Sequence, residues 1–280
     1  MTHMELRVLL TAFALGFLST TASSPQVPVT GEKRVSSPRP LADASDVLQH
    51  LYGKVVTYEE PFLVWRGDVV GDPNVKLGLF PRFQSFLMPS ELGSERDPGV
   101  ALEKTLDAYH RQTSSSRFKV LTSKLGYHIV PVQAHDERGA LVPVSSILDS
   151  RVAVAVQERT AGAHLRALAS AVTAATGINV GLGGQGDPGG FDRLFRARPS
   201  SGFAWGVGSM VARDALVELF DRSATTFSWR LFCQASSARA EDLRCALNLS
   251  LIEVAVTGPD GQPAMRVLRF DRCGDCPPVR

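Results

Sequence analysis

Residues Thr160–Val180, TAGAHLRALASAVTAATGINV, decide how this chain folds. Apolar side chains recur there at intervals of three and four residues, which places them on one side of an amphipathic helix. The residues of this stripe are Leu165, Leu168, Ala169 and Val172. Thr160 is a suitable N-terminal cap and Gly177 a suitable end, so the helix is expected between them. An extended run with Ile178 and Val180 comes next, so the unit is a helix and then a strand.

The same helix-then-strand unit recurs three more times, with stripes that begin at Ala44, Leu102 and Ala212. The second of these helices has a clear start, because Asp97-Pro98 supplies a cap and a first-turn proline. The spacing between the units is irregular, which argues against a solenoid with a fixed period. We therefore expect two copies of a paired unit, over residues 40–135 and 150–256 approximately.

The composition indicates a globular protein with a sizeable core, because 44% of the 280 residues are hydrophobic. The formal net charge of +2 is nearly neutral. Nothing in this charge balance indicates nucleic acid or an anionic membrane as the partner.

The N-terminus has the pattern of a secretory signal. Arg7 precedes the apolar run Val8–Leu18, VLLTAFALGFL, and small residues come after it over Ser19–Ser24. The run has 11 residues, against the roughly 20 that a membrane-spanning helix needs. This favours a cleaved signal over the alternative, a membrane anchor. We expect a mature chain without a transmembrane span, in the periplasm or outside the cell.

The expected fold class is α+β, because each helix is too short to be stable alone and must bury its stripe on a sheet. We expect two small sandwiches, each with helices on a mixed sheet, after the signal peptide. The expected boundaries are a signal peptide over residues 1–24, a linker over 25–40, a first domain over 41–145, a second over 146–257 and a C-terminal tail over 258–280.

The cysteines lie in the C-terminal part of the chain, at Cys233, Cys245, Cys273 and Cys276. An even number of cysteines in an exported protein favours disulfides. Alternation along two successive strands places Cys233 and Cys245 on the same apolar face of a hairpin, so we expect them to pair. Cys273 and Cys276 are then left to pair with each other, and a crossed pairing is the alternative. Two prolines come after Cys276, where a redox centre would instead need a helix start at Cys273.

Two segments carry a family resemblance. PLADASDVLQHLYGKVVTYEE, Pro40–Glu60, resembles the opening of the secretin and TonB short N-terminal (STN) domain: a Pro-Leu start, an Ala/Leu helix, a Gly stop and a Val-rich strand. Val100–Val132 is similar to that family's second half, a helix before a hairpin. The resemblance covers mainly residues 40–135, with a looser second copy. It implies a non-catalytic module of the bacterial envelope that forms rings or receives signals, and it supplies no catalytic residues.

A formal G-x-G-x-x-G pattern occurs at Gly181-Leu-Gly183-Gly-Gln-Gly186. A dinucleotide site needs a helix start directly behind the glycines, whose amides hold the pyrophosphate. Asp187-Pro188 and two further glycines occupy that position here, which is typical of a turn. We therefore expect a surface loop and no nucleotide or other cofactor.

A metal site could be assembled from His128, His135, Asp136 and Glu137. His128 belongs to a strand pattern, however, and the other three residues belong to a polar turn. We expect a solvated turn and no metal.

The remaining candidates for acid–base chemistry are Glu59 and Glu60. Adjacent residues of a strand point to opposite faces, so these two carboxylates are not expected to act as a pair. The chain also lacks a Gly-x-Ser-x-Gly nucleophile elbow. We therefore expect no catalytic residues and no enzymatic activity.

Three functions remain open. The favoured one is an exported, non-catalytic envelope protein with an interaction or structural role, and an envelope protein as partner. The alternative is a periplasmic module that binds a small molecule or peptide, in a groove lined by Trp65, Phe83, Phe203 and Trp205. A secreted hydrolase is the third. A pocket with convergent titratable groups would favour the hydrolase, and an open sheet edge would favour partner binding by strand addition.

Overall fold

The structure, a computed structural model, describes residues 33–71, 79–183, 202–222, 226–235, 243–257 and 262–267. The predicted signal segment, Cys273 and Cys276 lie outside these residues. The fold class is α+β, as predicted. The elements up to residue 143 are β1 (Arg34–Ser37), α1 (Pro40–Tyr52), β2 (Val55–Glu59), β3 (Val69–Val70), β4 (Phe80–Pro81), β5 (Gln84–Leu87), α2 (Pro98–Gln112), β6 (Arg117–Thr122), β7 (Gly126–His135) and β8 (Leu141–Pro143). The later elements are the 3-10 helix η1 (Ile147–Asp149), β9 (Arg151–Arg159), α3 (Ala161–Thr176), β10 (Asn179–Gly183), β11 (Phe203–Val211), α5 (Ala212–Asp221), β12 (Phe227–Ala235), β13 (Leu243–Leu251), β14 (Glu253–Thr257) and β15 (Pro263–Val267).

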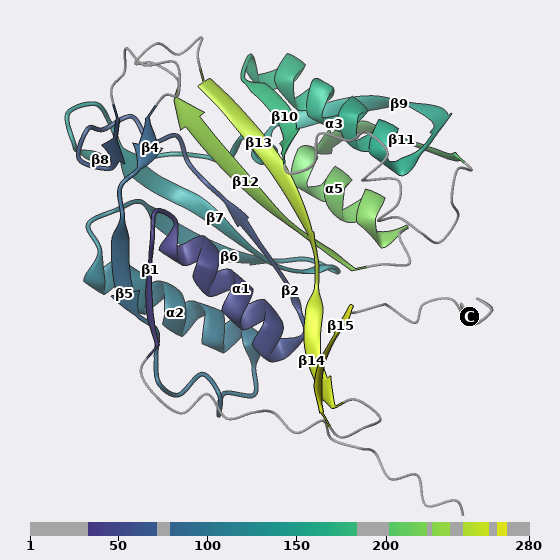
Figure 1. Ribbon diagram of the computed structural model, residues 1–280. Coiled ribbons are helices and arrows are strands. Elements are labelled where there is room, and N and C mark those ends of the chain that lie inside the picture. Colours follow the sequence, from purple (N-terminus) through teal and green to yellow (C-terminus); the bar gives the residue numbers. More distant parts are fainter. Residues whose placement is uncertain are drawn as a thin grey trace, which may run out of the picture.

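One mixed sheet of seven strands runs through the molecule, in the order β10-β13-β12-β2-β7-β6 with β8 paired to β7 (Figure 1). At its centre β12, from the second half of the chain, pairs in parallel with β2, from the first half; Arg230 lies opposite Tyr58. The two predicted sandwiches therefore share a sheet and do not have one each. This pairing joins residues that are far apart in the sequence, so the hydrophobic patterns within single segments could not predict it.

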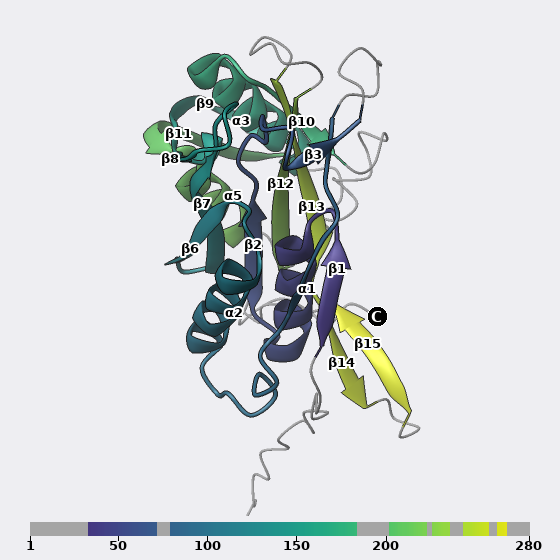
Figure 2. The same ribbon diagram turned by 90° about the vertical axis from the view of Figure 1, so that its left-hand side faces the viewer.

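The two faces of this sheet carry separate hydrophobic cores. Because side chains alternate along a strand, Val55 of β2 belongs to one core, whereas Val56 and Tyr58 belong to the other. Helices α3 and α5, with the two-stranded sheet β9–β11, cover the first face, and helices α1 and α2, with β1 and β5, cover the second (Figures 1 and 2). We call these the α3–α5 face and the α1–α2 face.

The predicted helix ends are confirmed. Helix α3 begins after Thr160, whose hydroxyl accepts a hydrogen bond from the Ala163 N–H, and ends at Gly177 with φ of 73°. Helix α2 begins after Asp97, whose carboxylate accepts from the Gly99 N–H. These caps satisfy backbone groups that have no partner within the helix, which is why they could be recognised from local sequence.

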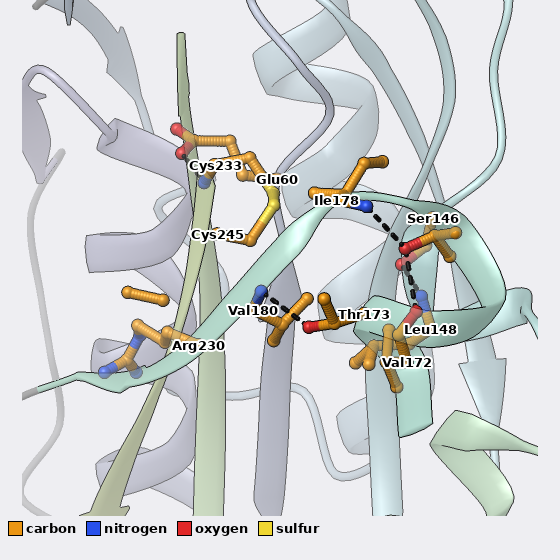
Figure 3. Close-up of a disulfide and its surroundings, with 12 residues drawn as sticks. Glu60, Ser146, Leu148, Val172, Thr173, Ile178, Val180, Arg230, Cys233 and Cys245 are labelled. Carbon is orange, nitrogen blue, oxygen red and sulfur yellow. Dashed lines mark hydrogen bonds between the residues drawn. A yellow bond between two sulfur atoms is a disulfide. The ribbon is translucent and has the colours of Figure 1, made fainter. Parts of the chain in front are cut away.

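The predicted disulfide between Cys233 and Cys245 is present, with an S–S distance of 2.10 Å (Figure 3). The two cysteines are directly opposite each other in the antiparallel pairing of β12 with β13, as the strand alternation predicted. Both are buried in the core of the α3–α5 face. Closing a loop of this size stabilises a fold by about 3 kcal/mol in the chain-entropy model.

The chain continues past the predicted end of the second domain as a hairpin. Strand β14 pairs with β15 in antiparallel fashion, with Val256 opposite Ala264. Strand β15 lies within the stretch 258–280 that was predicted to be a C-terminal tail. Among the helices that the structure describes, none is long and apolar enough to cross a membrane.

Candidate functional site

Strand β2 and the residue directly after it carry polar side chains that are buried in the interior, two carboxylates among them. Thr57 and Glu59 are buried on the α3–α5 face, and Glu60, directly after the strand, is buried on the α1–α2 face. The prediction that the two glutamates point to opposite faces is thus confirmed. An isolated buried carboxylate costs several kcal/mol or more, so the partners of each group decide its role.

Glu59 forms an ion pair with Arg213 of α5. The Arg213 Nε and Nη2 atoms donate to the two Glu59 oxygens, both at 2.7 Å, and Nη1 donates to Asp149 Oδ1 at 2.7 Å. Burial alone would lower the pKa of Arg213, but the hydrogen bonds with Glu59 and the charges of Glu59 and Asp149 raise it above its ordinary value. Asp149 also accepts from the Ser146 N–H. The pair therefore fixes α5 and η1 to the sheet.

Glu60 forms the corresponding pair on the α1–α2 face. Arg39, at the start of α1, donates from Nε to Oε1 at 2.8 Å and from Nη2 to Oε2 at 3.1 Å. Glu60 Oε2 also accepts from the Cys233 N–H at 2.9 Å, next to the disulfide (Figure 3). Burial raises the pKa of Glu60, and Arg39 opposes this effect. This carboxylate thus joins α1, β2 and β12.

A second set of polar side chains on the α3–α5 face resembles a catalytic arrangement. Ser123, in the turn between β6 and β7, lies with its Oγ 2.8 Å from His128 Nε2, and His128 Nδ1 lies 2.9 Å from Thr57 Oγ1. The His128 ring stacks on Trp229, with the ring centroids 5.0 Å apart. A hydroxyl beside an imidazole that a third group orients is the pattern of an activated nucleophile.

Ser123 also borders an open depression of about 510 Å³ between the β6–β7 turn and α5. Its other lining residues are Lys124, Met210, Asp214, Val217, Glu218, Asp221 and Arg222. Two ion pairs lie at its rim: Lys124 Nζ is 2.7 Å from Asp221 Oδ2, and Arg222 Nη2 is 3.6 Å from Glu218 Oε1. The combination of a hydroxyl, an imidazole and a cavity makes this the candidate active site.

The electrostatics of His128 oppose such a reaction. A general base in acyl transfer becomes an imidazolium, which a carboxylate on Nδ1 normally stabilises. Here burial lowers the pKa of His128 to about 3, with the charge of Arg213 acting in the same direction, and Nδ1 meets the neutral Thr57. In addition, Ser123 Oγ accepts from the Leu125 N–H at 3.1 Å and so shapes the turn. The arrangement fits a structural hydrogen-bond chain that anchors the hairpin on β2.

His135 does not lie in a solvated turn as predicted. It is buried at the end of β7, where its Nδ1 atom lies 2.7 Å from Asp68 Oδ2. Its ring packs against that of Trp65, with the ring centroids 4.5 Å apart. Only from Asp136 onwards does the chain turn. His135 and His128 have separate partners, and within the part of the chain that the structure describes no group of three or more His, Cys, Asp or Glu side chains could hold a metal.

The four aromatic residues of the predicted groove are not brought together. Phe203 and Trp205 of β11 both pack against His164 of α3, and Trp205 is only 1% exposed, in the core. Trp65 lies instead against His135, and Phe83, between β4 and β5, is 70% exposed.

Of the predicted glycine loop, only the first residues are described. Gly181 and Gly183 belong to β10, which pairs in parallel with β13, and residues 184–190 lie outside the described part of the chain. The extended run expected with Ile178 and Val180 is thus present as β10, but it continues to Gly183, so the first residues of the predicted surface loop are in a strand.

Comparison with protein-family models finds no match, and comparisons with curated proteins and with solved structures find none either. The similarity to STN domains therefore stays a prediction.

Proposed function

We propose that this chain is an exported protein of the cell envelope that acts by binding a partner and not by catalysis. The observation that carries the proposal is the environment of His128. Among the described residues this is the one imidazole that is hydrogen-bonded to a serine. Its low pKa and its neutral Nδ1 partner make it a poor base. The two buried glutamates support the same conclusion, because each is committed to an arginine that fixes a helix to the sheet.

Export is supported by the disulfide and by the N-terminal apolar run. A disulfide between opposed strands is stable in an oxidising compartment and rare in the cytosol. Cys233 and Cys245 are both buried, which fits a structural bond and not a redox centre. The resemblance of residues 40–135 to STN modules adds support for an interaction role in the envelope.

A second candidate is binding of a peptide in the depression beside Ser123. Asp214, Glu218 and Asp221 lie along one side of α5, and Lys124 and Arg222 contribute positive charge. Both signs of charge at the rim would suit the termini and side chains of a peptide. This depression would replace the aromatic groove predicted from the sequence.

The proposal is tested with a fluorophosphonate probe, which labels activated serines. Wild-type protein and the Ser123→Ala variant are incubated with the probe, and labelling is followed by mass spectrometry. We expect no labelling of Ser123, and equal background in both proteins. Labelling of wild type that disappears in both Ser123→Ala and His128→Gln would show an activated nucleophile and would overturn the proposal in favour of a hydrolase.

A further inference from the structure

A small cavity lies on the α1–α2 face, among residues of β2, of β5 and of the connection from α2 to β6. Its volume is about 20 Å³. A water molecule needs roughly 10 to 15 Å³ on this measure, so the cavity has room for one water and not for a larger molecule. Buried side chains of the α1–α2 core, Tyr58 and Phe118 among them, form part of its wall.

Two buried polar atoms belong to side chains that line this cavity. They are Ser116 Oγ and Gln84 Oε1, and neither has a hydrogen-bond partner among the described residues. Ser116 is only 1% exposed, so its hydroxyl is not reached by bulk solvent. Polar groups in protein interiors are nearly always paired, either with the protein or with an ordered water. Both atoms therefore require a partner that the described residues do not supply.

The charges at the cavity favour a neutral ligand over an ion. The two charged residues that line it, Arg39 and Glu60, are paired with each other through two hydrogen bonds, and Glu60 also accepts from the Cys233 N–H. Neither charge is thus available to hold an ion. Burial raises the pKa of Tyr58 well above its ordinary value, so its phenol contributes a neutral O–H group.

We propose that this cavity is the binding site of one structural water molecule, which bonds both Gln84 and Ser116. A water can donate and accept, so it satisfies the Gln84 amide in either of its two orientations as well as the serine hydroxyl. Gln84 begins β5, and Ser116 directly precedes β6. The water therefore joins the two-stranded sheet β1–β5 to the large sheet. This site is separate from the depression beside Ser123 and does not depend on the proposed function.

A high-resolution crystal structure of the full chain, together with proton NMR in solution, tests the proposal. We expect a density peak in the cavity at roughly 2.7 to 3.2 Å from both Ser116 Oγ and the Gln84 amide. In solution, the Ser116 N–H should give a water NOE with the sign of a long-lived contact. A cavity without density overturns the proposal. A peak at metal-ligand distances, about 2.5 Å or less, also overturns it, because the ligand would then be an ion.

Replacement of Ser116 by alanine removes one of the two partners of the water. In Ser116→Ala we expect the density peak and the NOE to be lost while circular dichroism shows the fold retained. The matched control is Ser45→Ala, a serine that is equally buried on the same face but whose hydroxyl donates to the Ala42 carbonyl. This control should keep the water. A water that stays at full occupancy in Ser116→Ala, or that is lost in Ser45→Ala as well, contradicts the site. If Ser116→Ala does not fold, the wild-type structure alone decides.

Discussion

The His128 imidazole lies between the hydroxyls of Thr57 and Ser123 and against the ring of Trp229. Burial and the charge of Arg213 lower its pKa to about 3, from 6.5 in the unfolded chain. Between these two values the unfolded chain binds a proton that the folded chain does not. The stabilising contribution of neutral His128 is therefore complete above pH 6.5 and is lost progressively as the pH falls towards 3.

This predicts a specific acid sensitivity that replacement of His128 removes. Between pH 7.5 and pH 5 the wild type should lose about 2 kcal/mol more unfolding free energy than His128→Asn does. The measurement is urea denaturation of both proteins at pH 7.5 and pH 5. The other titrating groups, Glu60 among them, are common to both proteins and cancel in the difference. Parallel pH profiles would show that His128 is protonated as easily in the folded as in the unfolded chain.

At the level of residues, the sequence showed what each side chain could do but not its partner. Strand alternation was enough to place Glu59 and Glu60 on opposite faces. It could not identify Arg213, which is 154 positions away from Glu59. The Ser123–His128–Thr57 chain was missed for the same reason, because it depends on the pairing of β2 with β7, in which Thr57 lies opposite His128. Once two strands are paired, a search for polar residues in register would have found it.

Among the elements, helices were predicted best because their signals are local: an apolar stripe, a cap and a glycine stop. Pairing between distant strands was not predictable in this way. No local sequence pattern indicates the parallel pairing of β12 with β2, and this pairing joins the two halves of the chain in one sheet. The predicted aromatic groove was wrong about Trp205 because an aromatic residue in a strand can face either solvent or core, and here it faces the core.

Two glycines at the ends of elements are required for different physical reasons, and replacement of each by alanine tests those reasons. Gly126 begins β7 with φ of 154°, and a Cβ there would clash with the carbonyl oxygen of Val55 in the paired strand β2. Gly177 ends α3 with φ of 73°, and a Cβ there would meet no atom within 4 Å. Gly177→Ala should cost about 1 kcal/mol of unfolding free energy, from backbone strain alone. Gly126→Ala should cost about 3 kcal/mol, because the backbone of β2 cannot move aside cheaply. Equal losses in urea denaturation would contradict the strand pairing.

At the scale of the whole molecule, two adjacent carboxylates, one at the end of β2 and one directly after it, join two helical layers to one shared sheet. Arg213 fixes the α3–α5 face through Glu59, and Arg39 fixes the α1–α2 face through Glu60. Because these carboxylates are adjacent in the sequence, at the end of β2, a disturbance on one face should also affect the other. These two buried ion pairs thus serve the architecture of the fold.

The most direct test is amide hydrogen exchange of the full chain, wild type against Glu59→Gln. Removing one charge of a buried pair costs roughly 3 kcal/mol, and in a single cooperative unit this loss appears in every core element. We predict that exchange becomes faster by a similar factor, of the order of a hundredfold, in α3 and in α1, although Glu59 does not lie on the α1–α2 face. The matched control is Glu95→Gln, a carboxylate paired with Lys104 at the surface, which should change neither helix. Faster exchange confined to α3 and α5, with α1 as protected as in wild type, would contradict the claim and show that the two halves are independent.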